Sequence, residues 1–98
     1  SPAERAEAPN LYRVLRNIAD AIAGGRTDYA NLESAGRMEL AQRGWKVDYI
    51  AVRNGLGLRI PHPEGFDHPN LLIVLAAATL GATRLIDNVD VIKKDGED

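Results

Sequence analysis

The first quarter of the chain has the apolar period of an α-helix. Its apolar stripe recurs at spacings of three and four residues, and polar residues occupy the other side. Pro9 lacks a backbone donor and lies inside this stretch, so we predict a helix over residues 2–24 that kinks or splits near Ala8. Gly24-Gly25 is expected to end the helix. The stripe consists of Leu11, Val14, Leu15, Ile18 and Ile22.

The opening residues Ser1-Pro2-Ala3-Glu4 have the pattern of a capping box with proline at the first helical position. A capping box needs backbone before its cap, and the chain does not begin with Met. The pattern fits a domain cut from a longer polypeptide, and it fits ordinary N-terminal processing equally well.

A second helix is predicted from a cap at Thr27 or Asp28 to Arg43. Its apolar face is thin and rich in small residues, which favours close packing against another element. Gly44 occupies the position of a left-handed C′ residue, and in a Schellman ending Trp45 would contact the last apolar residue of the helix. We therefore predict that Trp45 fills the core rather than binding a ligand. The apolar face consists of Leu32, Ala35, Gly36 and Leu40.

Residues 46–53 change to a period of two, which predicts a strand largely covered on both faces. One face is expected to hold Val47, Tyr49 and Ala51, and the other Asp48, Ile50 and Val52. Residues 71–80 are ambiguous, because their first half favours a buried strand and the alanines 76–78 favour a helix.

Residues 83–92 alternate again. Leu85, Asp87, Val89 and Val91 fall on one face, and Arg84, Ile86, Asn88, Asp90 and Ile92 on the other. The two runs on either side of Gly81-Ala82 are typical of a hairpin. The predicted order α-α-β-β-β corresponds to an α+β two-layer sandwich, in which two N-terminal helices pack on a three-stranded antiparallel sheet.

Residues 61–70 hold three prolines, two histidines and one glycine, which predicts a loop, and the charged residues 93–98 predict a mobile tail. His62, Glu64, Asp67 and His68 offer donors for a metal ion, but their spacing matches no zinc signature. Solvated loop histidines are the plainer interpretation.

Composition narrows the class of protein. With 98 residues and 45% apolar residues, the chain can form one domain with a real core. The absence of cysteine excludes disulfides and thiolate chemistry and fits a reducing cytoplasm. The net charge of −2 and scattered arginines show no basic stripe for nucleic acid. The longest apolar run, residues 71–80, is about half the ~20 residues of a membrane helix, so we expect a soluble cytoplasmic protein.

The residues supply little for catalysis. Ser1 and Ser34 are the only serines, neither is placed as a nucleophile, and no P-loop or dinucleotide fingerprint occurs. Arg84, Asp87 and Asn88 form a polar trio within an apolar strand. On a regular strand Asp87 would point away from the other two, although Asp87-Asn88 could also mark a bulge or turn. An internal ion pair, a docking contact and a contact with substrate all remain open for this trio.

Four stretches match a known family in order and spacing along almost the whole chain. They are SPAER (1–5), LYRVL (11–15), GWKVDYIAVR (44–53) and AAATLGATRLIDN (76–88), of which the closing TRLIDN is the most specific. On these residues the chain resembles the C-terminal domain of the pantothenate synthetases (pantoate–β-alanine ligases). Residues 55–70 depart from the family pattern, because they are longer and richer in Pro and His.

The resemblance implies an enzyme that condenses pantoate with β-alanine using ATP and magnesium. The reaction would pass through a pantoyl-adenylate and release AMP and pyrophosphate. The resemblance further implies that an N-terminal Rossmann-like domain, outside residues 1–98, holds the catalytic residues, both substrate pockets and the homodimer interface. Residues 1–98 would form a lid over that site, so no catalytic, cofactor-binding or metal-binding residue is assigned here. The alternative is a free-standing protein-interaction module without catalysis.

Overall fold

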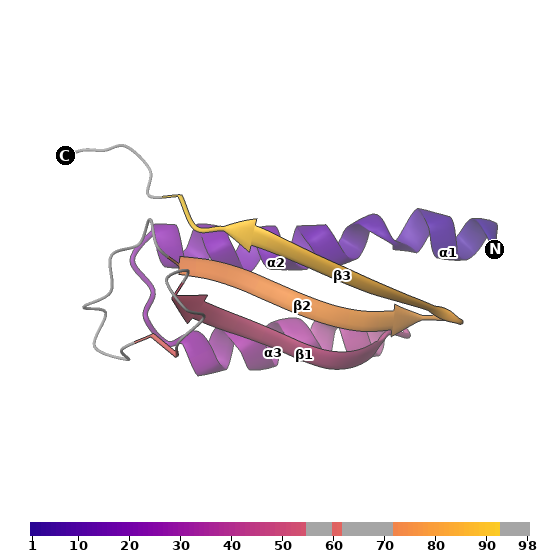
Figure 1. Cartoon of the computed structure of the whole chain (residues 1–98). Coiled ribbons are helices and arrows are strands. Elements are labelled where there is room, and N and C mark those ends of the chain that lie inside the picture. The colour runs from indigo at the N-terminus through magenta and orange to yellow at the C-terminus, as the bar shows by residue number, and fades with distance from the viewer. Residues whose placement is uncertain (55–59, 62–71, 93–98) are drawn as a thin grey trace.

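The computed structural model describes residues 1–54, 60–61 and 72–92. Three strands lie side by side in the order β1-β2-β3, both pairs antiparallel, with α2 and α3 on one face of the sheet (Figure 1). The predicted α+β two-layer sandwich is therefore confirmed. The elements are α1 (Pro2–Glu7), α2 (Pro9–Ala23), α3 (Tyr29–Gln42), β1 (Lys46–Asn54), β2 (Leu72–Leu80) and β3 (Thr83–Asp90).

The first helical stretch is divided where Pro9 predicts it. Helix α1 ends at Glu7, α2 begins at Pro9, and α1 continues nearly in line with α2 (Figure 1). The capping box is present, because Ser1 Oγ accepts the N–H of Glu4 at 3.2 Å. Helix α1 has no buried residue, so its position depends on polar contacts with its neighbours.

The end of α3 is the predicted Schellman motif. The N–H of Trp45 donates to the carbonyl oxygen of Leu40 at 3.0 Å, and that of Gly44 donates to Ala41 at 3.1 Å. Gly44 has a φ of +96°, which glycine adopts without a steric penalty. Trp45 is 3% exposed and Leu40 is 0% exposed, so the predicted core role of Trp45 is confirmed.

The start of α3 differs in detail from expectation. Asp28 occupies the cap position, but its side chain makes no capping hydrogen bond. Its carboxylate instead accepts from Arg26, whose Nε lies 2.9 Å from Asp28 Oδ1. This pairing lowers the pKa of Asp28 from 3.8 to about 2.

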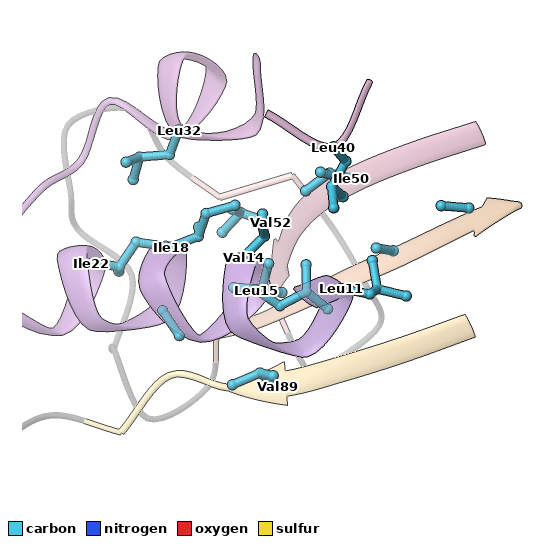
Figure 2. Packing of buried hydrophobic residues seen from close by; sticks show 14 of the residues in the cluster. Leu11, Val14, Leu15, Ile18, Ile22, Leu32, Leu40, Ile50, Val52 and Val89 are labelled. Atoms are coloured by element: carbon cyan, nitrogen blue, oxygen red, sulfur yellow. The ribbon is translucent and has the colours of Figure 1, made fainter. Parts of the chain in front are cut away.

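Helices α2 and α3 approach each other closely at Gly36. A Cβ placed there would stand 3.0 Å from both Ile18 Cδ1 and Val14 Cγ1. The small-residue face of α3 is thus confirmed at Gly36, and Ala35 lies exposed in the shallow groove between α2 and α3. Figure 2 shows the α2 stripe among side chains of α3 and the sheet, forming one core.

The ambiguous stretch is strand β2, and Leu80 pairs with Thr83 across the predicted hairpin turn. Gly81 has a φ of +62° in that turn, where a side chain would also meet the carboxylate of Glu4. Strand β3 pairs with β2 without any shift in register, so the alternative of a bulge at Asp87-Asn88 is wrong.

Strand β1 departs from strict alternation at Asp48. Its register shifts between Val47, which lies opposite Ala78, and Tyr49, which lies opposite Ala77. An extra residue in one strand reverses the side on which the following residues point. The prediction that Val47 and Tyr49 share a face is therefore wrong: Val47 packs against the core, while Tyr49 is 40% exposed.

Two sequence predictions lie outside the described residues. They are the tail over 93–98 and, apart from Ile60 and Pro61, the Pro- and His-rich loop over 55–70. His62, Glu64, Asp67 and His68 belong to that loop.

Candidate functional site

The polar trio of β3 is divided between the two faces of the sheet, as the alternation predicts. Arg84 and Asn88 pair with Thr79 and Leu75 on the face away from the helices. Asp87 lies opposite Ala76, which is fully buried on the helix side. The Asp87 carboxylate accepts the backbone N–H of Asn88 at 2.8 Å. It therefore hydrogen-bonds within β3, which is an outer strand of the sheet.

Arg84 has an internal partner. Its Nε donates to Asp48 Oδ2 at 2.9 Å, which joins β3 to β1 across the middle strand. Asp48 is the bulge residue of β1, and on the α3 side Arg37 donates to the carbonyl oxygen of the adjacent Val47 at 3.1 Å. The ion pair therefore fixes the bulge on the sheet face away from the helices, and Arg37 of α3 fixes it at the outer edge of β1.

Removing this ion pair is expected to cost little stability. Arg84 and Asp48 side chains are 52% and 40% exposed, and solvated pairs contribute about 0–1 kcal/mol. Arg84→Ala should therefore lower the free energy of unfolding by no more than about 1 kcal/mol in urea denaturation. A double-mutant cycle with Asp48→Ala isolates the pair, and a coupling above about 2 kcal/mol would contradict its solvated character.

The face of the sheet away from the helices has an apolar centre. Tyr49, Ala77 and Ile86 lie opposite one another across the three strands, and Ala51 pairs with Leu75 in the next row. Ile86 is 66% exposed, whereas Ala77 is 0% exposed because its larger neighbours surround it. We call these five residues and Ile73 the open apolar face.

The outer edge of β1 is covered by α3. Glu33 Oε2 accepts the N–H of Val52 at 2.8 Å and lies 3.7 Å from Arg53 Nη1. Together with Arg37 on Val47, this pairs backbone groups that an edge strand otherwise presents to other chains. Sequence reasoning missed this role, and the only signal was the four-residue spacing of Glu33 and Arg37 on one helix.

Glu7 joins α1 to the rest of the domain. Its Oε2 accepts from Arg43 Nε at 2.7 Å and from the indole N–H of Trp45 at 2.9 Å. These hydrogen bonds lower the pKa of Glu7 from 4.5 to about 2, and the one from Arg43 has the largest effect. A carboxylate held in this way is a structural anchor, since it is poorly suited to accept a proton near neutral pH.

Acid should weaken this anchor. The pKa of Glu7 is lower in the folded state, so its stabilisation is complete above about pH 4.5 and is lost as the pH falls toward about 2. We expect the urea midpoint to fall over that range and Glu7→Gln to make the fall shallower. An unchanged pH dependence in Glu7→Gln would contradict the contacts with Arg43 and Trp45.

A groove of about 380 Å³ lies at the start of α3, beside β1. Tyr29, Glu33, Val52, Arg53 and Ile60 are among the residues that line it. Both acids that line it are engaged, since Glu33 accepts from the Val52 N–H and Asp28 accepts from Arg26, so neither of them is a free general base. Within residues 1–54, 60–61 and 72–92, no three metal-binding side chains come together, and no helix has the length and apolar character to span a membrane.

Fold and surface together define an α+β domain in which helices α2 and α3 bury one sheet face, while the other has an apolar centre that no described helix or strand covers. The chain belongs to the pantoate-beta-alanine ligase family, whose model matches residues 1–90. It is 52% identical over 93 residues to the pantothenate synthetase of Chromobacterium violaceum, covering 95% of this chain and 32% of that protein.

A solved structure agrees with this assignment. The crystal structure of the pantothenate synthetase from Thermus thermophilus is similar with a TM-score of 0.65 and 31% identity, over 93% of this chain and 32% of that chain. The resemblance noted from the sequence is therefore confirmed. The chain spans about a third of the length of both relatives.

Proposed function

We propose that the chain is the lid domain of an ATP-dependent ligase that joins pantoate to β-alanine through a pantoyl-adenylate, releasing AMP and pyrophosphate. The observation that supports this is the family match over residues 1–90 in a chain that spans 32% of a related pantothenate synthetase. The described acids that could act in catalysis, such as Glu7, Glu33 and Asp87, are engaged in structural hydrogen bonds.

The role proposed for the lid is closure. Excluding water from a site that holds an acyl-adenylate favours attack by the amine over hydrolysis. The preceding N-terminal domain would hold ATP, magnesium, pantoate and β-alanine, and it would also form the homodimer. As an enzyme of pantothenate and coenzyme A biosynthesis, the whole protein would act in the cytoplasm.

The proposal is tested by comparing residues 1–98 with the parent polypeptide. Calorimetry with ATP and an assay of AMP release with pantoate and β-alanine should both give a signal for the parent only. Tight ATP binding by residues 1–98 alone would refute the division of labour between the two parts.

The open apolar face favours a second candidate, a free-standing module that docks a protein partner. The parent reading frame separates the two candidates. About 180 upstream residues with a Rossmann pattern would establish the enzyme, an estimate based on usual domain sizes. A start codon directly before Ser1 would favour the module.

A further inference from the structure

Strand β3 is, with β1, one of the two outer strands of the sheet (Figure 1). The N–H of Val91, just after β3, donates to the carbonyl oxygen of Leu72 in β2 at 3.0 Å, so the backbone of this residue faces the middle strand. Backbone groups face alternate sides along an antiparallel strand. Because β3 pairs with β2 without a shift in register, this alternation holds throughout the strand. The residues whose backbone N–H and carbonyl groups face outward are Arg84, Ile86, Asn88 and Asp90.

The two outer edges of the sheet are protected in different ways. On β1, the α3 side chains of Glu33 and Arg37 bond to the backbone of the edge. On β3, among the residues that the structure describes, the one side chain bonded to an outward-facing backbone group is Asp87, whose carboxylate accepts the N–H of Asn88. An open edge is a template for pairing with another chain, and charged side chains on it discourage such pairing. Aspartate is depleted in strands, so its place within β3 fits a protective role.

A second copy of the chain offers this edge a matching strand, because two β3 edges related by a two-fold axis present the same groups to each other. The outward-facing groups allow two antiparallel registers that overlap most of the strand. In the first, Ile86 lies opposite its own copy and Arg84 lies opposite Asn88. In the second, Asp87 lies opposite its own copy and Arg84 lies opposite Asp90.

Asp87 opposes both registers. Each of them requires the N–H of Asn88 to donate to the other copy, and that N–H is already bonded to the Asp87 carboxylate. The second register also places the two Asp87 residues in a pair whose Cα atoms lie about 4.5 Å apart, where like charges are destabilising. We propose that Asp87 keeps the edge of β3 closed to β3 of a second copy of the chain. This role is independent of the proposed ligase function.

The test measures the self-association of residues 1–98 by sedimentation velocity over a range of protein concentrations. Asp87→Val removes both the acceptor and the charge, and valine is favoured in strands, so the variant should fold. Asp90→Val is the matched control, because it removes the same charge from an exposed position of the same strand without freeing the N–H of Asn88. Asp87→Asn keeps an acceptor for that N–H and loses only the charge. Circular dichroism checks that each variant is folded.

We expect Asp87→Val to dimerise with a Kd at least about tenfold lower than those of the wild type and Asp90→Val, because its dimer gains a hydrogen bond from each Asn88 N–H. Asp87→Asn should lie between Asp87→Val and the wild type. In Asp87→Val, deuterium exchange at the outward-facing N–H of Ile86 should slow as the protein concentration rises.

Equal association of Asp87→Val and Asp90→Val would overturn the proposal, because loss of charge anywhere on the strand would then account for the effect. A dimer of Asp87→Val in which exchange at the Ile86 N–H stays unchanged would also overturn it. The two copies would in that case meet at another surface, such as the open apolar face.

Discussion

Replacing Trp45 with Ala is expected to lower the free energy of unfolding by about 3–5 kcal/mol. The indole is 3% exposed and directly follows the Schellman turn of α3, where it packs in the same core as Leu40. Truncation leaves a cavity whose lining loses its contacts. It also removes the N–H donor to Glu7, which lies 2.9 Å away and joins α1 to the domain.

The loss is measured by urea unfolding followed with far-UV circular dichroism, because Trp45 is the only tryptophan and its fluorescence disappears with it. Met38→Ala is the control, since this α3 side chain is 60% exposed and should change stability by less than about 0.5 kcal/mol. Trp45→Phe keeps most of the apolar volume but not the hydrogen bond, so its free energy of unfolding should lie between those of Trp45→Ala and Met38→Ala. Equal stabilities of Trp45→Ala and Met38→Ala would contradict the buried position.

The elements that sequence reasoning predicted correctly are those set by local signals. The apolar stripe of α2, the break at Pro9 and the Gly44-Trp45 ending each depend on residues within a few positions of one another. The hairpin turn at Gly81 is equally local, because glycine adopts its positive φ without a steric penalty. The predicted two-layer arrangement follows from these elements, since each must bury its apolar side.

What the sequence could not predict depends on partners distant in the chain. The bulge at Asp48 is defined only by the pairing of β1 with β2. Arg84 and Asp48 are 36 residues apart, and Glu7 and Trp45 are 38 apart. Alternation placed Arg84 on the correct face, but it could not distinguish an internal partner from one on another domain. The structure gives Arg84 an internal partner and leaves its side chain half exposed beside the open apolar face.

The second large effect is expected at Gly36, where α2 and α3 are closest. Gly36→Leu should lower the free energy of unfolding by about 1–3 kcal/mol or more, because added carbons in a filled core displace their neighbours. A Cβ alone would stand 3.0 Å from Ile18 Cδ1 and Val14 Cγ1 and 3.3 Å from Ile50 Cδ1. A leucine extends three carbons further and must separate α3 from both α2 and β1.

Ala35→Leu is the matched control, since it adds a similar side chain at the exposed neighbouring position of the same helix and should change stability by less than about 0.5 kcal/mol. Gly36→Ala tests the balance of two effects. Alanine favours a helix interior over glycine by about 1 kcal/mol, and the tight contacts with Ile18 and Val14 oppose that gain. Urea midpoints should therefore place Gly36→Ala well above Gly36→Leu. If Gly36→Leu were as stable as Ala35→Leu, the two helices could not be in contact at this residue.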